Sequence, residues 1–306
     1  MFSFFRRSLK PYQTGFVSVG QGHSLFYQQF GNPTGTVVLS FHGGPGGCGR
    51  AKHVLDYDLK TTRVIIFDQR GCGQSRYTDA FLDNTTQATI RDAVKLLDAL
   101  HIKKKIVVAG GSFGAGLALL FAEMYPQRVS KLILHSVFLM REQDALWVTH
   151  NSRLFYPDLI DEMRRQAKSD NIVPYYHTLI FSDKYKDIQQ AQKYFGSYEH
   201  QLGQTLVGFD KTPALTDSYI QSGRIYLHYE HNHFFVKDNQ ILDQINHIQS
   251  IPTLIVHNRL DFCCPIAGAY DLAQVLKKAR LVIVPEQGHG GPLLHKTLAK
   301  EIRDFL

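Results

Sequence analysis

Short apolar runs rich in β-branched residues alternate with helical patterns along most of this chain. The runs cover residues 37–40, 63–67, 106–109, 131–134, 253–256 and 281–284. Runs of this length and composition predict strands that are buried on both faces of a sheet. Between them, residues 86–100 and 114–124 place apolar side chains at helical spacing, and the second stretch stops close to Pro126. The alternation predicts a mostly parallel, doubly wound α/β sheet.

Both ends of the chain and one long middle segment depart from this rhythm. Residues 16–19 and 25–30 flank Gly20 and Gly22, which predicts an antiparallel hairpin at the sheet edge. Residues 294–306 predict a closing amphipathic helix. Between residues 138 and 234, mostly helical patterns rich in Tyr, Phe, Gln and His replace the strands. We therefore expect a core formed by 1–137 and 235–306, with 138–234 inserted as a mainly helical cap over one end of the sheet.

Composition narrows the class of protein. Of the 306 residues, 44% are hydrophobic and 20% are charged, which fits a globular protein with a sizeable core. No apolar run approaches the roughly 20 residues that span a bilayer. Phe2, Phe4 and Phe5 precede Arg6 and Arg7, which is the reverse of the order in a secretory signal. We expect a cytoplasmic protein with no membrane segment.

Charge and cysteine content exclude further classes. The net charge is +7, but the basic residues are dispersed, with short clusters only at 103–105 and 277–280, so we expect no nucleic-acid partner. The 4 Cys form no C-x-x-C pair, which argues against structural zinc, thioredoxin-like redox chemistry and a disulfide framework. The sequence leaves the oligomeric state open.

A tight turn follows the predicted strand 106–109. Residues 110–114 read Gly-Gly-Ser-Phe-Gly and lead directly into the predicted helix 114–124. A G-x-S-x-G pattern between a strand and a helix is typical of a nucleophile elbow, where small neighbours let the serine Oγ project freely. Such a pattern also arises by chance in glycine-rich turns, but the strand before it and the helix after it favour Ser112 as a nucleophile.

A serine hydroxyl needs a base and a carboxylate before it can act as a nucleophile near neutral pH. Asp261 and His289 each follow a predicted strand, at the carboxyl end, where open α/β sheets hold their ligands. Either residue alone fits an ordinary loop position equally well, because the chain has 15 His and Asp is common in turns. Their order after Ser112, acid and then histidine, is that of a catalytic triad. The hypothesis is that His289 takes the serine proton and Asp261 orients His289.

A glycine loop follows the predicted strand 37–40. Residues 42–47 read His-Gly-Gly-Pro-Gly-Gly, and glycine lets backbone N–H groups approach a substrate oxygen closely. We expect N–H groups of Gly43 or Gly44, together with that of Phe113, to form an oxyanion hole. Phosphate binding is the alternative, but the Lys and Ser/Thr of a P-loop are missing and Pro45 removes a donor.

With these motifs in place, the sequence resembles the α/β-hydrolase superfamily and, within it, the proline iminopeptidase family of serine aminopeptidases. The resemblance runs nearly end to end. Its phrases are His-Gly-Gly-Pro-Gly-Gly at 42–47, Asp-Gln-Arg-Gly-Cys-Gly-Gln-Ser at 68–75, Asn-Thr-Thr at 84–86, Asn-His-Phe-Phe-Val at 232–236 and Arg-Leu-Asp-Phe-Cys-Cys-Pro at 259–265. It implies an α/β-hydrolase fold and removal of an N-terminal residue, often proline, from small peptides.

The resemblance also implies that carboxylates of the cap hold the free amino group of the substrate. In the family phrase E-N-H-Y-F, the Glu meets the substrate amine. Aligning residues 232–233 with that phrase puts His231 at the Glu position and Glu230 one residue earlier. Residues 195–199 are similar to the family's W-x-x-W-E, which makes Glu199 a second candidate anchor.

Two further groups of residues carry chemically active side chains. His228, His231 and His233 form a possible metal cluster, because residues two apart on a strand, such as His231 and His233, share a face, but no nearby acid or Cys completes a known spacing. Cap packing or substrate contact is therefore favoured. Cys263 and Cys264 are expected to be small buried hydrophobes, and sensitivity of the activity to bulky thiol reagents is the alternative.

Together, these features predict a serine hydrolase that needs no metal, nucleotide or redox cofactor. Its expected substrate is a short peptide or an aminoacyl amide, cleaved through an acyl-enzyme. The nearest alternative is an esterase or amidase for small acyl groups that does not recognise an amine. A non-catalytic binding protein on the same fold is more remote, because Ser112, Asp261 and His289 are all present.

Overall fold

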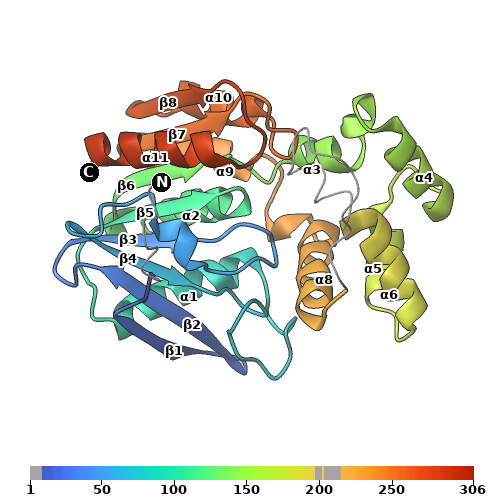
Figure 1. Ribbon diagram of the computed structural model, residues 1–306, viewed down its shortest axis with the longest axis horizontal. Helices are drawn as coiled ribbons and strands as arrows, with labels where there is room; N and C mark the ends of the chain where they lie inside the picture. The colour runs from blue at the N-terminus through green and yellow to red at the C-terminus, as the bar shows by residue number, and fades with distance from the viewer. Residues whose placement is uncertain (1–8, 197–201, 203–214) are drawn as a thin grey trace, which may run out of the picture.

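An eight-stranded sheet organises the molecule in a computed structural model that describes residues 9–196, 202 and 215–306 (Figure 1). The strands are β1 (Gln13–Gly20), β2 (His23–Gly31), β3 (Thr36–Phe41), β4 (Thr62–Phe67), β5 (Ile106–Gly111), β6 (Val129–His135), β7 (Thr253–Asn258) and β8 (Ala279–Val284). Their order across the sheet is β1-β2-β4-β3-β5-β6-β7-β8. The pairs β1–β2 and β2–β4 are antiparallel, and all the other neighbouring pairs are parallel. The predicted α/β fold with a mostly parallel sheet is confirmed.

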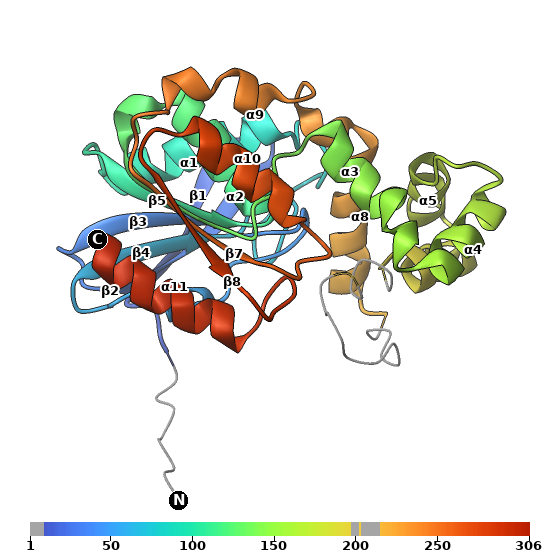
Figure 2. The ribbon, with the colours of Figure 1, turned by 90° about the horizontal axis from the view of Figure 1, so that it is seen from above.

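The central strands of the sheet are buried on both faces, because successive side chains point to opposite sides and helices cover each side. In β3, Val37 and Leu39 join one hydrophobic cluster, whereas Val38 joins another. Helices α1 (Thr86–Ala99), α2 (Phe113–Met124), α9 (Gln240–Asp243) and α10 (Ile266–Val275) cover one face, and α11 (Pro292–Phe305) covers the other (Figure 2). This two-sided burial explains why the strands read as uninterrupted apolar runs.

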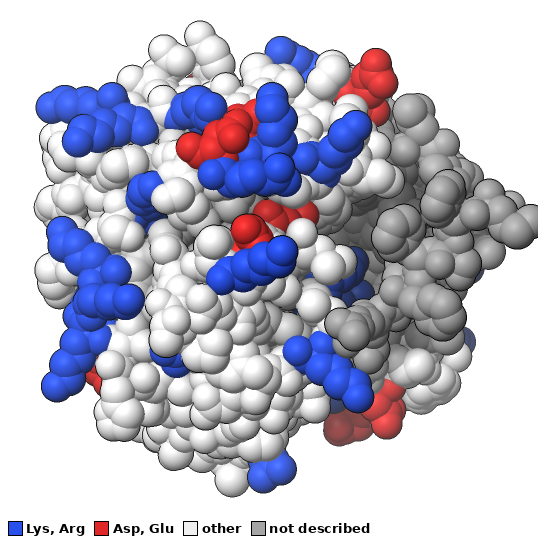
Figure 3. All heavy atoms as spheres, turned by 60° about the vertical axis from the view of Figure 1, so that its left-hand side comes forward, with Lys and Arg blue, Asp and Glu red and all other residues white. Residues whose placement is uncertain are grey.

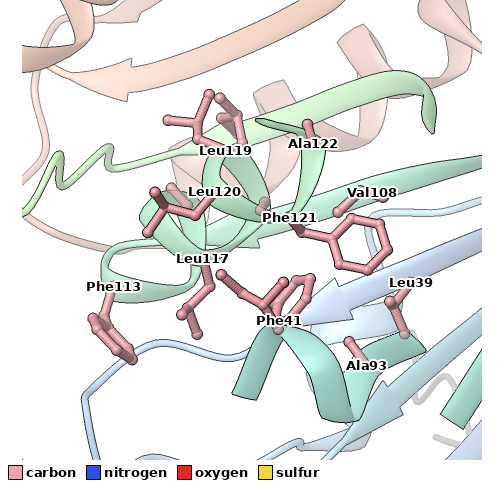
Figure 4. Close-up of a cluster of buried hydrophobic side chains, with 14 of the residues drawn as sticks. Leu39, Phe41, Ala93, Val108, Phe113, Leu117, Leu119, Leu120, Phe121 and Ala122 are labelled. Carbon is pink, nitrogen blue, oxygen red and sulfur yellow. The ribbon is translucent and has the colours of Figure 1, made fainter. Parts of the chain in front are cut away.

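Helix α2 is the most deeply buried helix next to the sheet. Figure 4 shows Leu117 and Phe121 of this helix beside Phe41 of β3. The ring centroids of Phe41 and Phe121 lie 5.9 Å apart. A Cβ atom on Gly114 would lie only 2.3 Å from the carbonyl oxygen of Phe41, so the helix can start this close to the sheet only with glycine there. This packing fixes the first turn of α2, which directly follows Ser112.

Local signals set the ends of the predicted elements. The Thr85 side chain accepts a hydrogen bond from the Ala88 N–H and caps α1, as the Thr-rich start predicted. Gly20 and Gly22 have positive φ angles in the turn of the β1–β2 hairpin. Strand β6 runs beyond the predicted 131–134 at both ends, because Val129 and His135 also pair with β5, although the polar Ser130 and His135 interrupt the apolar run.

The segment between β6 and β7 is mainly helical. Its longer helices are α3 (Glu142–Thr149), α4 (Pro157–Ala167), α5 (Val173–Ile180), α6 (Tyr185–Ala191) and α8 (Asp217–His231). Ile160, Met163 and Tyr176 help to form a separate hydrophobic cluster among these helices. Figures 1 and 2 show the group beside one end of the sheet. We keep the name cap for it, and the boundaries at residues 138 and 234 stay a prediction.

Short helical turns complete the described chain. They are η1 (Ala51–Val54), η2 (Pro126–Arg128), η3 (Asn151–Leu154), η4 (Gln192–Gly196), η5 (His233–Phe235) and η6 (Ile245–His247). Among the described residues, no helix combines the length and the apolar character required to cross a membrane. On the face seen in Figure 3, Lys and Arg side chains are scattered, and several lie beside Asp or Glu. On that face, the positive charge is therefore spread out.

Candidate active site

Ser112 occupies the turn that joins β5 to α2. Its backbone angles, φ 58° and ψ −129°, lie in a strained region for a residue other than glycine. The Ser112 N–H is 3.1 Å from the carbonyl oxygens of both His135 and Ser136, which anchors the turn to the end of β6. A Cβ atom on Gly110 would lie 2.0 Å from the carbonyl oxygen of Gly114, so the motif's glycines allow the turn to close. The tight strand-to-helix turn predicted from the sequence is thus present, and the role of Ser112 as a nucleophile stays a prediction.

Asp261 and His289 are hydrogen-bonded to each other in the loops after β7 and β8. His289 Nδ1 lies 3.0 Å from Oδ1 and 2.9 Å from Oδ2 of Asp261. Asp261 Oδ1 also accepts hydrogen bonds from the N–H groups of Cys263 and Cys264. Burial would raise the pKa of Asp261, but its interactions with His289, His257 and the Cys264 N–H together outweigh burial and bring the pKa below its ordinary value. An ionised Asp261 therefore holds Nδ1–H of His289 and leaves Nε2 as the basic nitrogen.

A second histidine, which the sequence analysis missed, supports this acid loop. His257 Nδ1 accepts a hydrogen bond from the Val137 N–H, and its Nε2 lies 2.8 Å from the Cys264 carbonyl oxygen. Nε2 is also 3.6 Å from Asp261 Oδ2. Burial lowers the pKa of His257, so the ring is neutral and its single proton sits on Nε2. The only signal was its position in the phrase 257–261, four residues before the acid.

The predicted oxyanion loop lies against Ser112. A Cβ atom on Gly43 would lie 3.1 Å from the Gly111 carbonyl oxygen and 3.3 Å from Ser112 Cβ. Gly44 has a φ of +129°, in the region that favours glycine. Phe113 is the first residue of α2, so its N–H belongs to the unbonded first turn of that helix. The structure brings these backbone groups together around one serine, and their role with an oxyanion stays a prediction.

His42 clamps this loop to the end of β4. Its Nδ1 lies 2.8 Å from the Gly43 carbonyl oxygen, and its Nε2 accepts a hydrogen bond from the Gln69 N–H. Burial lowers the pKa of His42 to about 4, so the ring is neutral and can donate at one nitrogen while it accepts at the other. Asp68 also holds this part of the chain, because its carboxylate accepts a hydrogen bond from the N–H of Gly49. These contacts explain why the phrases at 42–47 and 68–75 occur together.

Ser112 and His289 line a cavity of about 410 Å³ between the core and the cap. Phe138, Val148, Tyr226 and Phe234 contribute apolar wall, and Gly43, Gly44, Pro45, Gly196, Tyr219, Cys263 and Cys264 complete it. The rings of Phe138 and Phe234 meet edge to face, with centroids 5.1 Å apart. A cavity of this volume accepts a small-molecule group.

A second cavity, of about 280 Å³, reaches Ser112 and His289 as well. Its lining is more polar and includes Lys52, His53 and the ion pair of Asp56 with His295. The hydrogen bond from His295 to Asp56 raises the pKa of His295, whereas burial lowers the pKa of His53 to about 4. The two cavities that meet at Ser112 are therefore chemically different.

Of the three predicted amine contacts, Glu230 and His231 lie among the described residues, and their surroundings differ. Glu230 is buried on α8 and hydrogen-bonded to Tyr226, which lines the larger cavity, and burial raises its pKa to about 7. His231 is exposed, is not among the residues that line the cavity, and stacks on His177 with ring centroids 4.2 Å apart. Glu199 lies outside the described residues.

The arrangement considered for a histidine metal cluster was wrong in its premise. His228 and His231 lie on helix α8, and His233 begins the following turn η5, so none of the three residues lies on a strand. His228 Nε2 lies 2.9 Å from the Asn84 carbonyl oxygen, and its ring packs on Phe81. His228 therefore packs the cap onto the core, in line with the favoured interpretation.

The fold and the arrangement of Ser112, Asp261 and His289 are those of an α/β hydrolase. The alpha/beta hydrolase fold family matches residues 36–296. A probable proline iminopeptidase of Leptolyngbya boryana is 33% identical over 92% of this chain and 90% of its own length. Proline iminopeptidases of Arabidopsis thaliana and Neisseria meningitidis serogroup A are each 32% identical. The Arabidopsis match covers 92% of this chain and 76% of the relative, and the Neisseria match covers 97% of both.

Solved structures agree on the fold. A bromoperoxidase from Bacillus anthracis superposes with a TM-score of 0.65 at 17% identity, covering 96% of this chain and 99% of the other. A proline iminopeptidase-related protein from Thermus thermophilus superposes with a TM-score of 0.62 at 20% identity, covering 96% of this chain and 98% of the other. The sequence relatives show that the chain belongs to the proline iminopeptidase family of α/β hydrolases. The family predicted from the motifs is confirmed, and the protein is a hydrolase.

Proposed function

We propose that this protein is a cytoplasmic serine aminopeptidase that releases an N-terminal residue, with proline preferred, from short peptides. The observation that carries the proposal is that Ser112 and the bonded pair of Asp261 and His289 border an apolar cavity with a buried glutamate behind its wall. The relatives named proline iminopeptidases support the substrate class. No cofactor enters the chemistry described next.

In the first half-reaction, Ser112 becomes acylated. His289 Nε2 takes the proton of Ser112 Oγ while the oxygen attacks the carbonyl carbon of the substrate's first residue. The oxyanion that forms accepts hydrogen bonds from the N–H groups of Phe113 and of Gly43 or Gly44. His289 then donates its proton to the leaving nitrogen, the C–N bond breaks, and the shortened peptide departs with a free amine.

In the second half-reaction, water releases the bound residue. His289 takes a proton from water, and the hydroxide attacks the ester carbon through a second tetrahedral intermediate. The bond from that carbon to Ser112 Oγ breaks, and the serine recovers its proton from His289. Asp261 stays ionised throughout, consistent with its lowered pKa, and stabilises the imidazolium form of His289.

Specificity for a free N-terminus comes from the cap. The pyrrolidine ring of a prolyl residue packs on Phe138, Val148 and Phe234, and its ammonium group is held by carboxylate. Glu230 is the first candidate because it is buried beside Tyr226. Glu199 and His231 are the other candidate contacts with the substrate.

One observation favours a different substrate. His231 occupies the place of the family's glutamate and is exposed, and Glu230 does not itself line the cavity. If no carboxylate reaches the amine, the same machinery hydrolyses small acyl esters or amides without amine recognition. The esterase or amidase is therefore the second candidate.

The test compares four substrates on one enzyme: prolyl-, alanyl- and N-acetylprolyl-naphthylamide, and p-nitrophenyl acetate. We expect the prolyl amide to turn over fastest and N-acetylation to lower kcat/KM by at least about 100-fold, because a buried carboxylate then loses its partner. The Ser112→Ala variant serves as the inactive control for all four. Ester turnover without amide turnover, or equal rates on prolyl and N-acetylprolyl amides, would overturn the aminopeptidase.

A further inference from the structure

Three side chains that bind soft metals meet beside the nucleophile. One ligand atom each from Cys263, Cys264 and His289 lies within 4.8 Å of the other two. Cys264 Sγ is 3.9 Å from Ser112 Oγ, and all four residues line the larger cavity. Both cysteines are free thiols. This set of ligands is therefore open to an ion that enters the substrate cavity.

We infer that Cys263, Cys264 and His289 form a reversible Zn²⁺ site and that the bound ion blocks hydrolysis. Two thiolates and an imidazole are ligands that zinc prefers in tetrahedral sites. In such a site the two sulfur atoms stand about 3.8 Å apart. The ligand atoms here lie within 4.8 Å of one another, so small side-chain rotations suffice to bring them into place. Each thiol releases its proton to solvent when the ion binds, and no electron is transferred.

The acid of the triad already serves as the outer shell of such a site. Histidines that bind metals usually donate their other N–H to a carboxylate, which orients the ring. Here Asp261 Oδ2 lies 2.9 Å from His289 Nδ1, so Nε2 is the nitrogen that meets the metal. Asp261 is in turn held by the N–H groups of Cys263 and Cys264, so a single short loop carries both sulfur ligands and the orienting carboxylate.

The same nitrogen is needed for catalysis and for metal binding. His289 Nε2 must accept the proton of Ser112, and a metal bound there removes its lone pair. The fourth ligand position faces Ser112, whose Oγ or a water molecule completes the tetrahedron. Zinc is thus an inhibitor of this enzyme and has no part in its reaction. The absence of a C-x-x-C pair does not exclude this site, because its thiols come from adjacent residues.

The first experiment titrates ZnCl₂ against turnover in chelator-free buffer. We compare wild type with Cys263→Ala and Cys264→Ala, each measured relative to its own metal-free rate. The concentration for half inhibition should rise at least about tenfold in either variant. The matched control is Cys48→Ala, which removes another partly exposed thiol and should leave the zinc response unchanged. EDTA should restore the wild-type rate, and equal zinc sensitivity in all four proteins would overturn the site.

The second experiment detects the ion without any turnover. Co²⁺ added to the Ser112→Ala protein should give a thiolate-to-cobalt charge-transfer band in the near ultraviolet, and one equivalent of Zn²⁺ should abolish it. The band should be missing when Cys263→Ala and Cys264→Ala are added to that variant, with circular dichroism to verify its fold. A protein that shows no band in the Ser112→Ala background has no such site. Because no substrate is involved, this result is independent of the proposed peptidase activity.

Discussion

Helix α2 of the core and helix α8 of the cap each bury one glutamate, in different surroundings. Within the described residues, neither carboxyl oxygen of Glu123 on α2 has a hydrogen-bond partner, and burial raises its pKa to about 8. Glu230 on α8 is bonded to Tyr226 at the wall of the cavity, and burial raises its pKa to about 7. Burial alone therefore does not mark a functional acid. What distinguishes Glu230 is its hydrogen bond to Tyr226, a residue that lines the cavity beside Ser112.

The core and the cap also differ in where they carry their candidate functional residues. In the core, Ser112, Asp261 and His289 sit just past strand ends, and backbone hydrogen bonds fix the first two. In the cap, the candidate substrate contacts Glu230 and His231 lie near the end of a helix. The core thus carries the proposed bond-making groups, and the cap carries the groups proposed to select the substrate.

The largest expected effect tests the core. In Asp261→Asn, the amide no longer stabilises the imidazolium and favours the wrong tautomer of His289, so kcat should fall by roughly 10³–10⁴. The matched control is Asp56→Asn, which breaks the other Asp–His pair near Ser112, that with His295 in the polar cavity. We expect the control to change kcat severalfold at most. Similar losses in both variants, measured with prolyl-naphthylamide, would refute the assignment of the acid.

The next effect concerns the buried acid of α2. The pKa of Glu123 rises from 4.5 to about 8 on folding, so between these values the folded state holds more protons than the unfolded state. Stability must therefore fall as the pH rises through this window. Glu123→Gln removes the free-energy cost of ionising a buried carboxyl group. We expect this variant to be more stable than wild type by about 3 kcal/mol at pH 8, with little difference at pH 4. Urea unfolding at the two pH values measures this, and parallel pH profiles would contradict it.

The smallest effect tests the cap. Glu230→Gln should lower kcat/KM for prolyl-naphthylamide about 30-fold, mainly through KM, and leave p-nitrophenyl acetate within about twofold, because only the amine loses a partner. In wild type, the ratio of amide to ester kcat/KM should rise with pH through about 7, as Glu230 ionises, and the variant should lack this rise. Dividing by the ester rate removes the pH effects that the two substrates share.

His231→Ala is the comparison for this last prediction. His231 is exposed and stacked on His177, so its loss should change the same ratio far less than Glu230→Gln does. The reverse order of effects would show that the position aligned with the family's glutamate, and not Glu230, sets recognition of the amine.

The parts of this protein that could be predicted are those with local causes. The central parallel strands read as apolar runs because they are buried on both faces, and Ser112 stands in a five-residue motif whose glycines the turn requires. The hydrogen bond from the Gln69 N–H to His42 and that from the Val137 N–H to His257 join distant parts of the chain, and no local pattern encodes them. The placement of Cys264 against Ser112 likewise depends on how β5 and β7 are arranged in the sheet.

The site where the cap is inserted has a consequence for engineering and for divergence. Strands β6 and β7 are parallel neighbours, so the chain must cross back along the sheet between them whether or not a cap is present. Helix α9 and turn η6 pack on the sheet through Ile241 and Ile245 and belong to that return path. The cap helices are thus an insertion in a crossover connection that the sheet requires. The entropic cost of closing such a connection grows only slowly with its length. We therefore expect that exchanging cap segments between relatives keeps the strand register that supports the reacting groups.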